Sequence, residues 1–308
     1  MINFRYHVVS LTAVFLALAI GLVVGTAALN GPISDSLSDK VNSLSKEKSE
    51  LRDRLTSTEN ELNRREDFAV QAAPRLLGNT LANHRVLLLV LPGAKEYVDG
   101  VMEMLKIAGA TVTGRVDVLD KLTNPGNNED LLALADQSLP PSVPGAELPA
   151  NSKGVETSGA LLAGVLMDRP GTPVPPGDQL SVLTAYSSAG FISVTGAKVG
   201  GPAEAVVIVG SGPYKDRDAG GKNEAVVTLV EQFDKAGPVV VAGTDGGEGN
   251  VISAVRGDPA LSKTISTVDN VPTSQGRVVT VMAITEQLVQ KKVGHYGAGS
   301  GATALMPK

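Results

Sequence analysis

An uninterrupted apolar stretch near the amino terminus constrains this chain more than any other feature. Residues 8–29 read VVSLTAVFLALAIGLVVGTAAL and contain no charged side chain. A helix of this length reaches about 33 Å, which is enough to cross a hydrocarbon core of about 30 Å. The sequence therefore predicts a transmembrane helix at residues 8–29.

The charges on either side of this stretch predict its orientation. Arg5 precedes it with no acidic residue nearby, whereas the first charges behind it are Asp35 and Asp39. Because positive charge is retained in the cytoplasm, we expect residues 1–7 to be cytoplasmic and the bulk of the chain to be periplasmic (extracytoplasmic), anchored in the inner membrane. The alternative is a cleaved signal peptide, since Gly25-Thr26-Ala27 resembles a cleavage site. The apolar run is, however, longer than the ~7–15 residues of a signal core.

Small residues recur along one face of the predicted span. Ala17, Gly21 and Gly25 are four positions apart, so they lie on the same side of a helix. Missing side chains let two membrane helices approach closely. This face predicts a dimer contact, and the general abundance of Gly and Ala in membrane helices is the alternative explanation.

A charged, leucine-containing segment follows at residues 34–66. Its apolar residues are spaced by fours and threes, with Lys48 and Thr58 in two gaps; they are Leu37, Val41, Leu44, Leu51, Leu55 and Leu62. Such a narrow heptad seam, with polar residues elsewhere, predicts a parallel coiled-coil homodimer. A helix packed on its own domain would give a similar pattern and is the alternative. Lys48 at an a position is expected to set register or oligomeric state at some cost in stability.

The remaining chain alternates between strand and helix patterns. Residues 67–84 predict a connecting helix interrupted at Pro74. Strands are predicted at 85–91, 111–118, 191–194, 205–209 and 238–242, with helical spacing between most of them. This pattern predicts an α/β domain at residues 85–290, with a mainly parallel, Rossmann-like sheet covered by helices on both faces. Residues 277–284 are compatible with a strand or a helix, with Val-Val-Thr-Val favouring a strand, and residues 286–292 favour a helix. A glycine-rich tail follows at 291–308.

Composition excludes several classes of function. The net charge is −5, no basic tract is present, Trp is absent and aromatic residues make up 3%, so nucleic acid is not an expected partner. The absence of cysteine excludes disulfides and thiolate metal sites. No His-Glu-x-x-His or Gly-x-Ser-x-Gly motif is present. We therefore expect a protein that is not an enzyme and holds no cofactor.

Three residues are nevertheless candidates for a ligand or partner contact. Asp245 lies in a glycine-rich loop after a predicted strand, where α/β sheets bind ligands. The loops at 210–212 and 243–247 are not full phosphate-binding motifs, so strand-ending turns are the alternative. His295 and Tyr296 place an imidazole and a phenol in the glycine-rich tail. A tail docked on the domain surface is the alternative for both, and His295 is a weak candidate metal ligand.

Several strings, in a fixed order and over nearly the whole chain, resemble the actinobacterial family of mycobacterial copper transport protein B (MctB), which includes the SteB-like cell-separation proteins. The first is His7-Val8-Val9-Ser10-Leu11, which runs into Ala13-Val14-Phe15-Leu16-Ala17-Leu18-Ala19 within the apolar span. The others are Gly190-Phe191-Ile192, Ala242-Gly243-Thr244-Asp245-Gly246, Ser266-Thr267-Val268-Asp269, Gly276-Arg277 and Gly294-His295-Tyr296-Gly297-Ala298-Gly299.

The resemblance implies a role in copper transport or efflux and copper homeostasis, and an outer-membrane channel is proposed for the family. The SteB-like members imply the alternative, a dimeric scaffold that regulates cell separation by acting with a partner on a peptidoglycan hydrolase. Cu(I) prefers Cys or Met ligands and Cu(II) prefers imidazole. This chain offers only His7, His84 and His295, and Met102 and Met104 point to different faces of their predicted helix. Copper is therefore expected from the resemblance alone.

Overall fold

The computed structural model describes residues 4–29, 32–149, 153–169, 171, 173–195, 200–244, 247 and 249–308. Its contacts divide the chain into two units, Met1–Arg64 and Arg65–Lys308. Each unit is described by itself.

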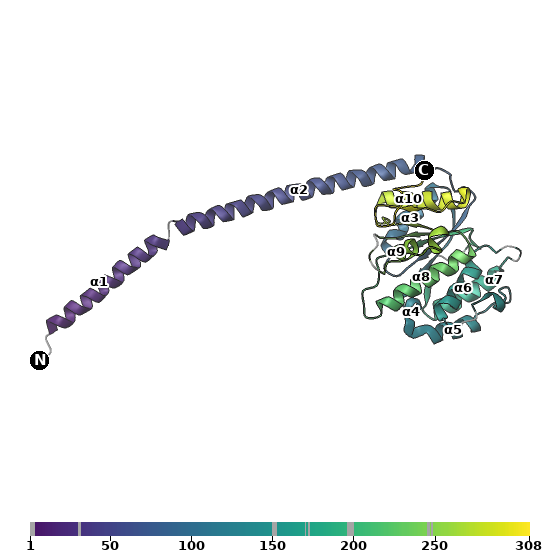
Figure 1. Ribbon diagram of the computed structural model, residues 1–308, viewed down its shortest axis with the longest axis horizontal. Helices are drawn as coiled ribbons and strands as arrows, with labels where there is room; N and C mark the ends of the chain where they lie inside the picture. The colour runs from purple at the N-terminus through teal and green to yellow at the C-terminus, as the bar shows by residue number, and fades with distance from the viewer. Residues whose placement is uncertain are drawn as a thin grey trace. The chain divides into compact units, whose positions relative to one another are not determined.

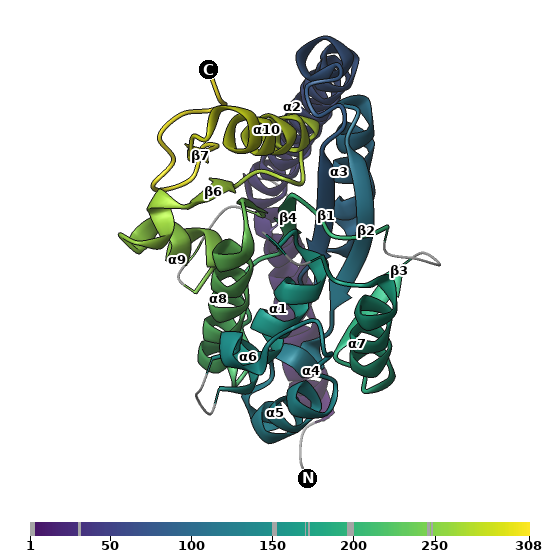
Figure 2. The ribbon, with the colours of Figure 1, turned by 90° about the vertical axis from the view of Figure 1, so that its right-hand side faces the viewer.

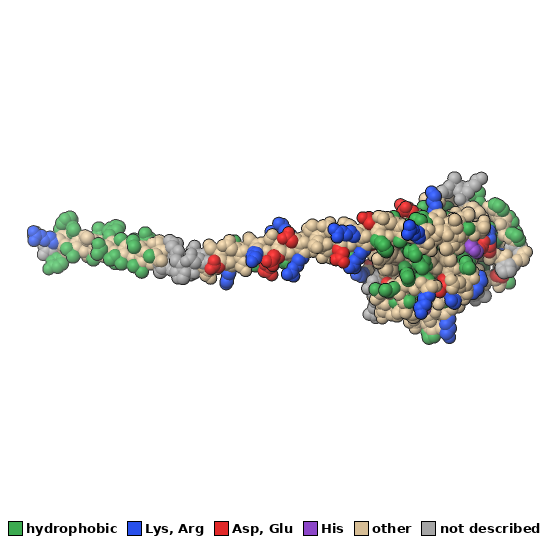
Figure 3. Space-filling view, turned by 90° about the horizontal axis from the view of Figure 1, so that it is seen from above, with side chains coloured by type: hydrophobic (Ala, Val, Ile, Leu, Met, Phe, Trp, Pro, Cys, Tyr) green, Lys and Arg blue, Asp and Glu red, His purple; other side chains and the backbone are tan. Residues whose placement is uncertain are grey.

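The first unit contains two helices. Helix α1 spans Phe4–Leu29, and helix α2 spans Pro32–Leu77 and continues into the second unit. Within α1, Phe4–Ala27 is long and apolar enough to cross a membrane, with a mean hydropathy of 2.6. Figure 3 shows apolar side chains covering α1 and charged side chains along α2. The described chain thus has one helix suited to membrane anchoring. The sequence Asn30-Gly31-Pro32 favours a helix break after the span, and residues 30 and 31 lie outside the described residues.

The connecting helix differs from its prediction, because α2 runs through Pro74 to Leu77 without interruption. The last turns of α2 place Ala73 and Leu77 in the core of the α/β domain, where both are fully buried. Near the start of this segment, the Glu66 carboxylate accepts a hydrogen bond of 2.6 Å from the backbone N–H of Ser274. Tertiary packing therefore holds a helix that proline alone would have disfavoured.

A seven-stranded sheet forms the centre of the second unit, in the order β3-β2-β1-β4-β5-β6-β7. Figure 2 shows this sheet, and Figure 1 shows helices of the same unit around it. All neighbouring strands are parallel except β2 and β3, which pair antiparallel. The strands are β1 (Arg85–Val90), β2 (Thr111–Val118), β3 (Ile192–Thr195), β4 (Ala205–Val209), β5 (Val239–Ala242), β6 (Ile265–Val268) and β7 (His295–Tyr296).

Helices cover both faces of this sheet. Helices α3 (Lys95–Ile107) and α10 (Ser274–Thr285) pack on one face together with the end of α2. The other face carries α4 (Asp120–Thr123), α5 (Asn128–Gln137), α6 (Gly154–Leu166), α7 (Pro176–Ser188), α8 (Ala219–Ala236) and α9 (Val251–Gly257). Alternate residues of β1 enter the two cores, Leu87 and Leu89 on one side and Leu88 and Val90 on the other. The predicted α/β class is confirmed.

The segment expected to be a strand at residues 277–284 is helix α10. Its start is capped by Thr273, whose hydroxyl accepts a 3.0 Å hydrogen bond from the backbone N–H of Gly276. Val278 and Val281 then bury their side chains against the sheet. Packing thus outweighs the β preference of valine and threonine. Helix α9 and strand β6 were not predicted from the sequence, and strand β7 lies within the predicted glycine-rich tail.

Candidate functional site

The carboxyl ends of β1 and β4 mark the usual ligand position of a sheet with this order. The chain passes from β1 to β2 on one side and adds β4 on the other side, so the strand order reverses between β1 and β4. Open α/β sheets bind ligands in the crevice at such a point. Leu91-Pro92-Gly93 follows β1 here, and Gly210-Ser211-Gly212-Pro213 follows β4.

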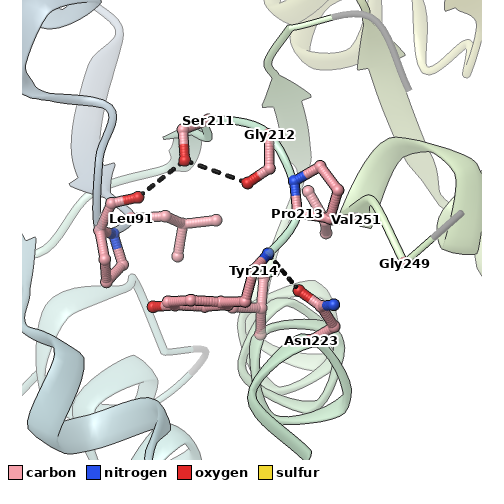
Figure 4. A pocket seen from close by; sticks show the side chains of 10 residues that line it. Leu91, Ser211, Gly212, Pro213, Tyr214, Asn223, Gly249 and Val251 are labelled. Carbon is pink, nitrogen blue, oxygen red and sulfur yellow. Dashed lines mark hydrogen bonds between the residues drawn. The ribbon is translucent and has the colours of Figure 1, made fainter. Parts of the chain in front are cut away.

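In this chain the crevice is almost filled by its own loops (Figure 4). The Ser211 hydroxyl donates a 2.9 Å hydrogen bond to the carbonyl of Pro92. Gly93 has φ +81°, and a Cβ there would lie 2.9 Å from Ser211 Oγ. The remaining cavity is ≈ 20 Å³, room for about one water molecule. The loop at 210–212 therefore acts as a packed, strand-ending turn.

Tyr214 forms the floor of this crevice. Its hydroxyl lies 3.0 Å from Thr123 Oγ1 and donates to Asp120 Oδ1 at 3.2 Å. Burial raises the pKa of Tyr214 to about 12, against the opposing effect of the hydrogen bond with Thr123. The Lys222 ammonium lies 5.2 Å from the centre of the ring. A phenol with this pKa stays protonated at neutral pH, so it serves here as a hydrogen-bonding anchor for the loop.

The second predicted ligand loop is described only in part. Asp245 and Gly246 lie outside the described residues. The backbone N–H of Gly243 bonds to the carbonyl of Val268 at 2.9 Å, so the loop starts as a continuation of the β5–β6 pairing.

The glycine-rich tail is fastened to the domain by a buried ion pair. Arg256 Nη1 lies 2.8 Å from Asp269 Oδ2, and the two side chains are 5% and 2% exposed. The same guanidinium donates to the carbonyls of Ser300 and Tyr296, both at 2.9 Å. Asp269 accepts hydrogen bonds from the backbone N–H groups of Ala298 and Gly299. We call Arg256, Thr267, Asp269 and residues 294–301 the C-terminal clasp.

His295 lies inside this clasp with both ring nitrogens engaged. Nε2 is 3.0 Å from the carbonyl of Ser262, so it carries the proton. Nδ1 is 2.9 Å from Thr267 Oγ1, which itself accepts a hydrogen bond from Arg256 Nε. Burial lowers the pKa of His295, and the charge of Arg256 acts in the same direction, whereas the bond to Ser262 opposes both. The imidazole is therefore held neutral, as a structural link between β6 and β7.

Tyr296 points into the domain and donates a short hydrogen bond to Glu286. Glu286 begins the π-helical turn Glu286–Gln290 that follows α10. Burial raises the pKa of Tyr296, and so do the bond with Glu286 and the charge of that carboxylate. The structure thus brings His295 and Tyr296 together with Arg256 and Asp269, and places the tail on the domain surface. Asp269 belonged to a recognised sequence string, whereas nothing in the sequence marked Arg256.

An exposed apolar groove was not predicted from the sequence. It has a cavity volume of ≈ 280 Å³ and lies within the second unit. We define the α2–α10 groove by its lining residues, which are Phe68, Ala69, Ala72, Leu76, Asn270, Gln275, Val278, Val279, Met282, Leu305 and Met306. Phe68 and Leu305 are 71% and 73% exposed. Large apolar side chains so exposed and so clustered mark an interaction surface.

The residues predicted to form a dimer seam are exposed in the single chain. Leu37, Val41, Leu44, Leu51, Leu55 and Leu62 are each 53–63% exposed. On α1, a Cβ added at Gly21 or Gly25 would meet no atom within 4 Å. Both sets are therefore available to a partner.

Comparison with known proteins identifies the family. The family model described as "Copper transport outer membrane protein, MctB" matches residues 1–307. This chain belongs to the MctB family. The "Copper transporter MctB" of Mycobacterium tuberculosis (strain CDC 1551 / Oshkosh) is 28% identical to this chain, over 99% of both chains. That of Mycobacterium leprae (strain TN) is 30% identical, also over 99% of both chains.

The MctB name raises the question of copper donors. Among the residues that the structure describes, no three His, Cys, Asp or Glu side chains could hold a metal ion together. His84 Nδ1 lies 2.7 Å from Glu204 Oε2, and both nitrogens of His295 are already hydrogen-bonded. Met104 is buried and Met102 is partly buried against the same core, although the sequence predicts that the two point to different faces of their helix. These residues do not fit a built copper site.

Proposed function

We propose that this protein is a non-enzymatic, single-pass protein of the cell envelope that contributes to copper transport and copper homeostasis. The full-length match to the MctB family, from the anchor to the clasp, is the observation that carries this proposal. The names of the mycobacterial relatives supply the link to copper. The α/β domain acts through protein contacts in this proposal, because His84 and His295, the histidines of that domain, both make structural hydrogen bonds.

The proposed topology places α1 in the inner membrane and the α/β domain on the periplasmic side. Arg5 before the span and the acidic residues after it support this orientation. The family description instead speaks of an outer membrane protein. Alkaline phosphatase fused after Lys308 should be active, and the protein should fractionate with the inner membrane. An inactive fusion, or recovery with the outer membrane, would refute this topology.

The copper proposal is tested in cells and with the purified chain. A deletion strain should accumulate more copper or stop growing at a lower copper concentration than its parent, and the intact gene should restore both. The full chain in detergent should bind neither Cu(I) nor Cu(II) stoichiometrically. Micromolar or tighter binding that is lost in His295→Ala would refute the claim that the domain acts through protein contacts.

A second candidate is a dimeric scaffold that regulates cell separation by activating a peptidoglycan hydrolase. The cavity of ≈ 20 Å³ at the strand-order reversal favours it, since a scaffold needs surfaces and no substrate pocket. The heptad seam supports a parallel homodimer in both proposals. Chained cells in the deletion strain at normal copper would favour the scaffold, and normal separation with altered copper tolerance would favour the first candidate.

A further inference from the structure

We propose that the α2–α10 groove receives helix α2 of a second copy of this chain, so that the dimer interface includes the α/β domain. The inference rests on the parallel homodimer proposed above, and it goes beyond the coiled-coil seam of residues 37–62. Its occupant is identified by the spacing of residues along α2 and by the side of α2 on which the domain packs.

The heptad spacing continues past the last leucine of the predicted seam. Counting fours and threes onward from Leu62, the next seam positions are Arg65, Ala69, Ala72 and Leu76. The last three all line the groove. Ala69 is only 6% exposed, so the domain already covers this a position. Ala72 is half-buried and small, which lets a second helix approach closely, and Leu76 is 48% exposed at the next a position. The groove thus opens on the face of α2 that a parallel partner helix would contact.

The flanking positions show how a second copy would fit. Glu66 and Ala73 follow d positions and are therefore e residues; Glu66 binds the start of α10, and Ala73 is fully buried in the domain. The domain consequently packs on the e side of α2. Phe68 precedes an a position and is therefore a g residue.

In parallel coiled coils a g residue packs beside the e residue of the partner five positions further on. For Phe68 that residue is Ala73, which is fully buried in the same core as residues of α10. Phe68 of one copy would therefore insert beside α10 of the other, against Met282. This apolar contact explains why an exposed phenylalanine occupies a g position, where charged residues are usual.

The chemistry of the groove suits this occupant. Its wall is formed by Val278, Val279 and Met282 of α10 and by Leu305 and Met306 near the carboxyl end. Methionine adapts its shape to an incoming side chain, and aromatic and methionine residues are enriched at interfaces. Twofold symmetry would fill two such grooves at once, since each copy offers both a groove and a helix.

The absence of cysteine makes a disulfide test direct, because every introduced thiol is unique. We would place single cysteines in the full chain, embedded in membranes, at Leu44 in the seam, at Ala72 in the groove and at Gln71 on the outer face. Under mild oxidation, L44C and A72C should form disulfide-linked dimers about tenfold faster than Q71C, because only seam positions meet within disulfide distance.

A mixed pair of chains tests the groove itself. A chain with Phe68→Cys and one tag is co-expressed with a differently tagged chain carrying Met282→Cys. The expected result is a disulfide-linked species that carries both tags, since Phe68 of one copy should reach Met282 of the other. Replacing Phe68→Cys by Gln71→Cys in the same pair should abolish that species.

The outcomes separate the two proposals. If L44C cross-links but neither A72C nor the mixed pair does, the coiled-coil dimer is supported and the groove contact is overturned. Failure of both L44C and A72C would overturn the parallel dimer and the groove contact together. If A72C does not cross-link but is protected from maleimide in cells, the groove holds a different protein and our inference is wrong. Equal rates for Q71C and A72C would indicate random collision and would also overturn it.

Discussion

Asp269 holds the guanidinium of Arg256 with a 2.8 Å contact at a place where both side chains are almost completely buried. Through this pair, helix α9, strand β6 and the glycine-rich tail are joined into one clasp. Buried pairs of this kind contribute little net stability when intact, but removing one partner strands a charge in the interior.

We expect Asp269→Ala to reduce the free energy of unfolding by about 3–5 kcal/mol, because Arg256 would remain buried without its carboxylate. Chemical denaturation of the detergent-solubilised full chain measures this. Lys95→Ala is the matched control, since Lys95 is 64% exposed in its 3.7 Å ion pair with Asp117, and we expect a change of about 0–1 kcal/mol. Equal losses in the two variants would contradict a buried clasp.

Stability should also depend on pH through His295. The pKa of His295 in the folded state is lowered from its usual 6.5, chiefly by burial. The unfolded chain therefore binds a proton at higher pH than the folded chain does, so this contribution is complete above pH 6.5 and is lost as the pH falls through the lowered folded pKa. Denaturation between pH 5 and pH 7.5 should show a shallower slope in His295→Gln. An unchanged slope would show that His295 does not titrate in this way.

Gly297 tests the close approach of the tail to Asp269. It has φ +124°, and a Cβ there would lie 2.0 Å from Asp269 Oδ1. Gly297→Ala should therefore destabilise the protein by more than ~1 kcal/mol and release the tail to limited proteolysis. In Gly220→Ala, a helical control with no atom within 4 Å of the added Cβ, we expect a gain of about 0.5–1 kcal/mol.

Lys48 tests the proposed seam. It occupies an a position, where a polar residue is expected to lower stability in exchange for a defined register. Lys48→Leu should stabilise the dimer by about 1.5–3 kcal/mol, as measured by the concentration dependence of thermal unfolding. Lys46→Leu, at an f position facing solvent, is the control. A loss of stability in Lys48→Leu alone would argue against the seam.

The sequence predicts the layered α/β fold well because its inner strands are fully apolar. Val207 of β4 and Val240 of β5 are completely buried, so their apolar side chains directly indicate the apolar core around them. Val278 to Val281 carry the same residue types but form a helix, because three-dimensional packing against α3 and the sheet decides their state. Local propensity cannot report that packing.

The sequence predicted some residues of the candidate site but not what those residues do in the structure. His295, Tyr296 and Asp269 all stand in strings that mark the family resemblance, yet their partners are Thr267, Glu286 and Arg256. Pairings between residues 13 or more positions apart, such as Arg256 with Asp269, leave no periodic signal. The α2–α10 groove is likewise built from three distant segments, and its apolar lining reads as ordinary core in a linear sequence.

The clasp has a consequence for synthesis of the protein. Strand β7 covers the edge of β6, and in chain order it follows every other strand of the sheet. Until they arrive, β6 presents an open edge, which invites pairing with other chains. Polypeptides that terminate before residue 294 would expose this edge permanently. A covered β6 therefore reports that translation has passed residue 296, and products terminated earlier would be distinguishable to proteases and chaperones by their uncovered strand.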